Sequence, residues 1–283
     1  MSMLQNKVDF ALILSVTNAN PNGDPLNGNR PRENYDGFGE ISDVCLKRKI
    51  RNRLLDMGQP IFVQSDDKCV DGYRSLKDRA DACAELKQAE KRKDREAFQR
   101  IACAAWLDVR SFGQVFAFKD SGVSFAVRGP LSIHPAITVS PVDVESIQIT
   151  KSVNSVTGDK KSSDTMGMKH RIPFGLYVTY GSINCQLAEK TGFSEEDADL
   201  IHEALRTLFE NDCSSARPDG SMEVCRLIWW KHNCKNGQYS SAKVHRTLHV
   251  SAKDGCDIPH CFTDYTVTLD HLDGLEPQII DGI

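Results

Sequence analysis

The sequence predicts an α+β domain whose core runs strand, helix, strand and then strand, helix, strand again. Residues 8–17 form an apolar run rich in branched side chains, which is typical of a buried strand. Leu46, Ile50, Leu54 and Met57 then recur at helical spacing and predict a helix with one apolar face. This strand and this helix open the first half of the core.

The second half repeats the pattern. Residues 174–187 are expected to form a strand, and Ser194 with Asp197 has the spacing of a capping box at the start of the next helix. This order is the split βαβ arrangement of ferredoxin-like and RNA-recognition folds, which host many unrelated functions. Extended chain is also expected at 123–139, 147–150, 222–232, 243–250 and 262–269.

A helical insertion separates the two halves. Residues 73–107 are rich in Ala, Lys and Glu and contain neither Gly nor Pro, which predicts one or two helices. We therefore divide the chain into a first half of the core at 1–60, an insertion at 61–110 and a second half of the core at 111–283.

Two polar segments interrupt the core. Between residues 18 and 40 the chain is dominated by Asn, Gly and Pro, which excludes regular structure and leaves backbone groups free to meet a ligand. Residues 151–171 are rich in Ser, Lys and Gly and cannot contribute to a core. We expect the first segment to be a functional loop and the second to be a protruding arm.

Composition is that of an ordinary globular protein. The chain has 283 residues, 40% hydrophobic content and a formal net charge of −4, and its opening residues lack the features of a secretory signal. No segment reaches the roughly 18 apolar residues of a membrane span. The ten cysteines include no C-x-x-C pair, so reduced thiols in the cytoplasm are expected. The closest approach to a metal cluster lacks tightly spaced paired ligands, and we expect neither a metal nor a cofactor; its members are Cys225, His232 and Cys234, with His260 and Cys261 further on.

A basic cluster lies on the first predicted helix. Ser42 suits the N-cap of that helix, and Lys47 and Arg51 fall one turn apart on a flank of its apolar stripe. A basic flank is either a solvated surface or a face that binds phosphates, and the residues alone leave both interpretations open.

Four motifs together resemble one known family. N-A-N-P-N-G-D-P closes the first strand, I-S-D-V-C-L-K-R-K-I-R opens the first helix, D-V-R-S-F-G follows the insertion, and M-G-M-K-H-R-I-P-F-G-L-Y lies in the second half. In combination they are similar to the subtype I-C member of the Cascade backbone-subunit family, which belongs to the RAMP superfamily and has an RNA-recognition-like core. The resemblance runs through nearly the whole chain and is least diagnostic in the insertion and the last forty or so residues.

The resemblance implies a hand-shaped subunit. The split βαβ core would be the palm, the insertion the fingers, and the arm at about 145–172 a thumb that reaches over a neighbouring copy. Several copies would stack head to tail along a CRISPR guide RNA and present it to target DNA. Further implied partners are a guide-processing subunit that caps one end and a large subunit that reads the flanking motif of the target; no membrane is implied.

The resemblance also implies RNA contacts. The first helix would bind phosphates, Phe112 and Gly113 would line the RNA path, and the thumb would displace a nucleotide at regular intervals with Met166 and Met168 as apolar wedges. A turn between insertion and core is the alternative role for Phe112 and Gly113. The complete implied set is Asn20, Arg30, Ser42, Lys47, Arg48, Arg51, Phe112, Gly113, Gln114, Lys151, Met166, Met168, Lys169, His170 and Arg171, with Lys160 and Lys161 as further phosphate partners.

We expect a non-catalytic subunit, and three alternatives stay open. Related superfamily members cleave RNA, and a loop aspartate such as Asp24, Asp36 or Asp43, or one of the histidines, would serve an RNA endonuclease. A metabolic enzyme that binds a phosphate in the Asn/Gly-rich loop lacks the support of a G-x-x-x-x-G-K-[ST] or strand-linked G-x-G-x-x-G motif. The third alternative is a structural oligomer without nucleic acid.

Overall fold

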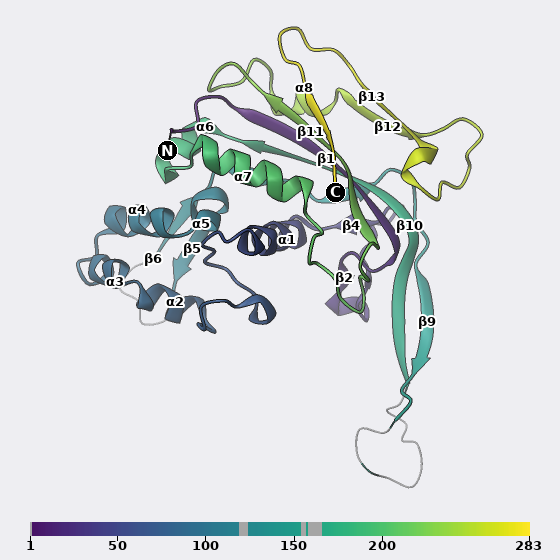
Figure 1. Cartoon of the computed structure of the whole chain (residues 1–283), viewed down its shortest axis with the longest axis horizontal. Coiled ribbons are helices and arrows are strands. Elements are labelled where there is room, and N and C mark those ends of the chain that lie inside the picture. Colours follow the sequence, from purple (N-terminus) through teal and green to yellow (C-terminus); the bar gives the residue numbers. More distant parts are fainter. Residues whose placement is uncertain (1, 119–123, 154–156, 158–165) are drawn as a thin grey trace.

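A broad antiparallel sheet forms the centre of the molecule (Figure 1). The computed structural model describes residues 2–118, 124–153, 157 and 166–283. The sheet has the order β14-β11-β1-β10-β8-β4, and β7 and β9 also pair with β10. Its strands are β1 (Val8–Ala19), β4 (Glu40–Ile41), β7 (Leu131–Ile133), β8 (Ala136–Thr138), β9 (Glu145–Thr150), β10 (Met166–Ile183), β11 (Met222–Lys231) and β14 (Gln278–Asp281).

The topology of these strands is that of a split βαβ core. Along the chain, the four positions of the core are filled by β1, by β7 with β8, by β10 and by β11. Across the sheet they follow the order β11, β1, β10 and then β7 with β8, so the fourth position lies beside the first and the third lies beside the second. Neighbouring strands are antiparallel. The predicted α+β class and the predicted core are therefore confirmed.

Strand β1 is buried on both faces. All nine residues from Val8 to Val16 are buried, because successive side chains enter two different layers. Phe10 and Leu12 pack toward the helices, whereas Ala11 and Ile13 pack toward the C-terminal part of the chain.

Helices cover one face of the sheet. They are α1 (Asp43–Asp56), α6 (Cys185–Thr191) and α7 (Glu195–Arg206). The Ser42 Oγ accepts a hydrogen bond from the Cys45 N–H (3.3 Å), and Ser194 with Asp197 forms the expected capping box. The strand predicted at 174–187 ends earlier, at Ile183, because Asn184 caps α6.

The second face is covered by α8 (Ser241–His245) and a ribbon of β12 (Leu248–Ala252) and β13 (Tyr265–Leu269), which a short 3₁₀ turn η4 (Phe262–Asp264) precedes. The strand predicted from 243 starts at Leu248, because Ser240 caps α8. Alternation along a strand predicts that one of Trp229 and Trp230 is exposed, but their exposed fractions are 6% and 1%. The reason is this second layer, which buries the face that a two-layer fold leaves open.

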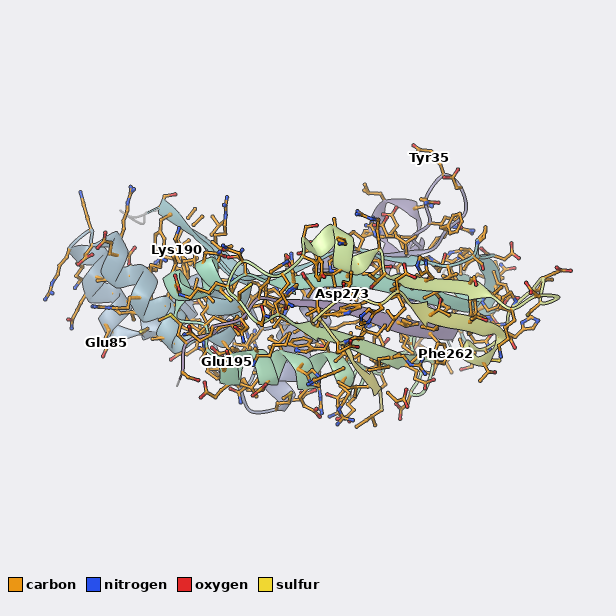
Figure 2. All side chains as sticks on the ribbon, turned by 90° about the horizontal axis from the view of Figure 1, so that it is seen from above. Tyr35, Glu85, Lys190, Glu195, Phe262 and Asp273 are labelled. Atoms are coloured by element: carbon orange, nitrogen blue, oxygen red, sulfur yellow. The ribbon has the colours of Figure 1, made fainter. Side chains whose placement is uncertain are left out.

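The insertion forms its own small hydrophobic cluster. The rings of Phe62 and Phe98 each lie against Phe116, with centroids 5.3 and 5.2 Å apart. Its described residues contain more helices than the one or two predicted, because the chain is extended at Cys83 and Trp106 and has a positive φ at Lys93. Figure 2 shows the insertion, marked by Glu85, and the C-terminal layer, marked by Phe262, toward opposite ends of the molecule. Its helical elements are η2 (Asp66–Lys68), α2 (Leu76–Ala82), α3 (Ala84–Lys91), α4 (Arg95–Ala105) and α5 (Leu107–Phe112). The hairpin of β5 (Gly113–Ala117) and β6 (Ser124–Arg128) follows the predicted boundary at residue 110, and its Phe116 and Val127 join the same hydrophobic cluster.

A two-stranded arm projects from the body, and it consists of β9 and the first part of β10 (Figure 1). The sequence predicts a protruding polar arm up to Arg171 without regular structure of its own, but β10 begins at Met166, and each residue from Met166 to Arg171 pairs with β9.

The Asn/Gly-rich segment also departs from its prediction. It contains β2 (Gly23–Asp24), a 3₁₀ turn η1 (Pro25–Asn27) and β3 (Arg30–Pro31), where no regular structure is expected. The hairpin forms because the Asp24 side chain caps the turn and Gly28 adopts a positive φ of 59°.

No helix in the described part of the chain is long and apolar enough to span a bilayer.

Candidate nucleic-acid interface

The segment between β1 and α1 is tied to the helix N-terminus. The Oδ1 of Asn22 accepts hydrogen bonds from the N–H of Ser42 (2.9 Å) and from its Oγ (2.8 Å). Asn20 is buried, and its Nδ2 donates to the carbonyl of Asn29 (2.7 Å). The Oδ1 of Asn20 is buried without a hydrogen-bond partner among the described residues. Two predicted site residues, Asn20 and Ser42, thus shape the loop, and Asn22 is a contributor that sequence reasoning missed.

The cations of α1 are already bonded within the chain. Lys47 pairs with Asp43 one turn away (3.0 Å). Arg48 donates to the carbonyl of Val63 (2.7 Å), and burial lowers the pKa of its guanidinium from the usual value. Two further cations of α1 contact the chain around the end of α7, where Lys49 pairs with Asp212 and Arg53 bonds to Thr207.

Arg51 belongs to a buried joint between α1 and the insertion. Its Nε donates to Asp108 (2.9 Å), and its guanidinium lies 4.8 Å from the ring centroid of Phe112. Asp108 is fully buried and also accepts hydrogen bonds from the N–H groups of Phe62 (2.7 Å) and Val63 (3.1 Å). Asp108 therefore holds the insertion against the helix, a role that no spacing in the sequence indicates.

Gly113 makes a close approach, and the backbone it approaches belongs to this chain. Its φ of 81° and ψ of 172° lie in a region that only glycine enters readily. A Cβ there would lie 2.2 Å from the carbonyl oxygen of Val127 and 2.7 Å from the amide nitrogen of Gly129. The alternative reading, a turn between insertion and core, fits this geometry, whereas RNA contact by Phe112, Gly113 and Gln114 stays a prediction.

One face of the arm gathers several predicted residues. Met166, Met168 and His170 alternate along β10 and share a face, and the exposed fractions of the two methionines are 59% and 55%. At the base of this face the Oγ of Ser146 lies 2.9 Å from the Nδ1 of His170 and accepts a hydrogen bond from Arg30. Arg30 comes from the loop, so the loop and the arm meet at Ser146.

The opposite face of the arm carries a different set. Ile147 and Ile149 of β9 are 38% and 49% exposed, and the register places Lys169 directly opposite Ile147. Arg171 pairs with Glu145 (2.8 Å) on this face. Lys151 follows β9 and is exposed, whereas Lys160 and Lys161 lie outside the described residues.

The predicted residues thus form two groups with the loop between them. One group surrounds α1, and the other lies on the arm. Asn22 fixes the loop to the first group through Ser42, which lies 20 positions further along the chain. Arg30 fixes the loop to the second group through Ser146, which lies 116 positions further along. Ser146 carries no sequence signal, because its contacts depend on the pairing of β9 with β10.

Several residues that an RNA endonuclease could use have structural partners. Asp24 caps a turn and lies 3.4 Å from Arg32. His232 is buried, with its Nε2 2.8 Å from Asp9 and its Nδ1 accepting from the N–H of Gln238 (3.0 Å). No group of three metal-binding side chains occurs within the described ranges.

Comparisons with known proteins point to one family. The family model of CRISPR-associated protein Cas7 matches residues 6–270. A CRISPR-associated protein Cas7 from Haloferax volcanii is 26% identical over 227 residues, which are 74% of this chain and 66% of the relative's length. A chain of a CRISPR RNA-guided surveillance complex, pre-nicking, is similar with a TM-score of 0.48, 15% identity and coverage of 79% of this chain and 78% of that chain. A chain of a CRISPR RNA-guided surveillance complex has a TM-score of 0.47, 17% identity and coverage of 88% and 77%. Because the family model spans nearly the whole sequence, as the four motifs led us to expect, the chain belongs to the CRISPR-associated protein Cas7 family.

Proposed function

We propose that this protein is a non-catalytic backbone subunit that coats a CRISPR guide RNA in a type I-C surveillance complex. The observation that carries the proposal is the junction at Ser146, where Arg30 of the loop and His170 of the arm meet beneath two exposed methionines. A guanidinium and an imidazole beside exposed, flexible apolar side chains suit a ligand with phosphates and bases. Family membership supports the CRISPR setting, and the quoted motifs support subtype I-C.

Binding would occur through the sugar-phosphate backbone of the RNA. Lys47 and Arg30 supply charge without reading bases, so affinity is independent of guide sequence and weakens with salt. Met166 and Met168 lie farther out on the arm and would wedge between bases, which displaces one nucleotide per subunit. The remaining bases stay free to pair with target DNA, and pairing supplies the specificity.

Copies would associate head to tail along the guide. Such contacts are heterologous and do not close, so the length of the assembly follows the length of the RNA and its end-capping subunits. The guide-processing subunit and the large subunit complete the proposed set of partners.

The test is assembly on RNA of defined length. We expect the protein with guide transcripts of increasing length to form particles whose mass, measured by light scattering after size exclusion, rises in steps of one 31.5 kDa chain plus its RNA. A guide of scrambled sequence is the matched control and is expected to give the same masses. A monomer indifferent to RNA would overturn the proposal, and RNA cut at regular intervals with a divalent metal would favour the endonuclease alternative.

A further inference from the structure

A groove of about 740 Å³ lies between β12 and the main sheet, on the face that the C-terminal layer covers incompletely. Val178 and Tyr180 of β10 and Val139 line it from the sheet, and Val250 lines it from β12. Its other lining residues include Glu40, Ile137, Leu248 and His249. No lysine or arginine among the described residues lines it, so the groove suits an apolar protein segment better than a phosphate backbone.

One wall of the groove is an edge of β12 that pairs with no other strand in the described part of the chain. The carbonyl of Thr247 accepts from the N–H of Asp270 (2.9 Å), which makes this pair a hydrogen-bonded one. Hydrogen-bonded and non-hydrogen-bonded pairs alternate in an antiparallel ladder, so the backbone groups of Leu248, Val250 and Ala252 point away from β13. An extended segment can therefore add to β12 as a new strand.

The arm carries a segment that matches this edge. Strand β9 pairs with β10 on one side only, and all six of its residues are exposed. Its length of roughly 20 Å is close to the roughly 17 Å of β12, at about 3.3 Å per residue. Ile147 and Ile149 lie on the same face of β9. A strand added to β12 needs such an apolar face to cover the apolar floor of the groove.

Charge complements this fit. Lys169 shares the face of Ile147 and has no ion-pair partner among the residues that the structure describes. Glu40 lines the groove and likewise pairs with no cation in the described ranges. Glu40 lies on β4, which follows β10 and β8 in the sheet, so a docked β9 would lie over β8 and its β10 partner over β4. In this order the strand that carries Lys169 lies beside β4, the strand of Glu40.

The groove and the arm of one molecule cannot meet. Lys169 and Val178 lie on the same strand, nine residues and roughly 30 Å apart, and a strand does not fold back on itself. The arm also projects away from the body (Figure 1). The occupant must come from another molecule, and a second copy offers the matching edge, apolar face and cation.

We propose that β9 of one copy adds to the free edge of β12 of the next copy, with Ile147 and Ile149 in the groove and Lys169 paired with Glu40. The inference rests on the proposed function for its setting, because a contact this small needs the shared RNA to raise the local concentration of neighbouring copies.

Cross-linking of the unmodified protein tests the contact. We expect a zero-length carbodiimide reagent, added to ¹⁴N- and ¹⁵N-labelled protein mixed on a long RNA, to join Lys169 to Glu40 in mixed-label peptides identified by mass spectrometry. Assembled particles in which this peptide is absent, or in which both ends always carry the same label, would overturn the inference while leaving the proposed function intact.

A complementation experiment tests its direction. The double variant Ile147→Asp, Ile149→Asp disables the arm edge, and Glu40→Lys disables the groove. On an RNA long enough for several copies, the protein concentration that each variant needs for cooperative assembly is expected to rise by about tenfold or more. Mixed on an RNA long enough for two copies, the two variants are expected to give dimers, because one intact edge meets one intact groove. Melting curves exclude misfolding, and affinity for an RNA that holds one copy reports RNA binding by itself.

The possible outcomes separate the two proposals. Assembly of the edge variant at the level of the unmodified protein overturns the docking. If RNA protects the groove residues when only one copy is bound, the docking is also overturned, because the occupant is then the nucleic acid. If the unmodified protein does not bind an RNA that holds one copy, the proposed function is overturned instead.

Discussion

Helix α1 and the arm both carry residues expected to bind RNA, but the chain uses them differently. On α1, Arg48 and Arg51 are bonded to the insertion and partly buried. On the arm, Met168 and His170 lie on a projecting hairpin that contributes little to the core. Arg48 and Arg51 therefore stabilise the fold, whereas a residue on the arm can be changed with little effect on stability.

The largest expected effect on the free energy of unfolding is at Arg51. Arg51→Ala leaves the carboxylate of Asp108 buried without its ionic partner, and we expect a loss of about 3 kcal/mol. Urea unfolding measures it. Arg51→Ala combined with Asp108→Asn is the control, because removing the charge as well is expected to restore part of the stability. Unchanged stability in Arg51→Ala would show that the joint does not hold the insertion.

Gly113 gives the next largest effect. Gly113→Ala places a Cβ against the backbone of β6 at a φ of 81°, so we expect a loss of about 2 kcal/mol in urea unfolding. Gly58→Ala is the matched control, because Gly58 has a φ of 77° and its added Cβ meets nothing within 4 Å. Equal losses in the two variants would mean that the close approach contributes nothing beyond backbone strain.

The pH dependence of stability is expected to come in part from His245. Burial lowers the pKa of this side chain, whose Nε2 lies 3.1 Å from the carbonyl oxygen of Gly181. A histidine with a lowered folded-state pKa contributes stability above the unfolded value of about 6.5, and this stability falls as pH decreases below it, by at most about 1.4 kcal/mol per pH unit. Urea unfolding between pH 7.5 and 5.5 measures this slope. His245→Gln should flatten it, and an unchanged slope in this variant would contradict the assignment.

Periodicity and caps predicted much of this fold. The apolar stripe of α1 and the capping box of Ser194 appear where the sequence placed them, because both depend on residues within one or two turns. The burial of both Trp229 and Trp230 was not predicted, because it depends on a layer formed by the last forty or so residues.

The candidate site shows the same limit. The spacing of Lys47 and Arg51 could be read from the sequence, but the fact that Arg51 bonds to Asp108 could not, because 57 residues separate them. The alternation of Met166, Met168 and His170 is local and visible, whereas Ser146 joins them only through the pairing of two strands across the arm.

The smallest effect on stability, and the clearest effect on binding, is expected at Lys47. Lys47 pairs with Asp43 one turn away at 3.0 Å, and Lys77 on the insertion pairs with Asp81 in the same manner at 2.7 Å. Lys47→Ala is expected to alter the unfolding free energy by less than about 0.5 kcal/mol, and the exposed Lys77 serves as the matched surface control. If α1 faces phosphates, Lys47→Ala alone reduces the slope of log affinity against log salt by about one, for every guide sequence tested by filter binding. Equal slopes for both variants would place the RNA away from α1, and the arm and loop would then account for the binding.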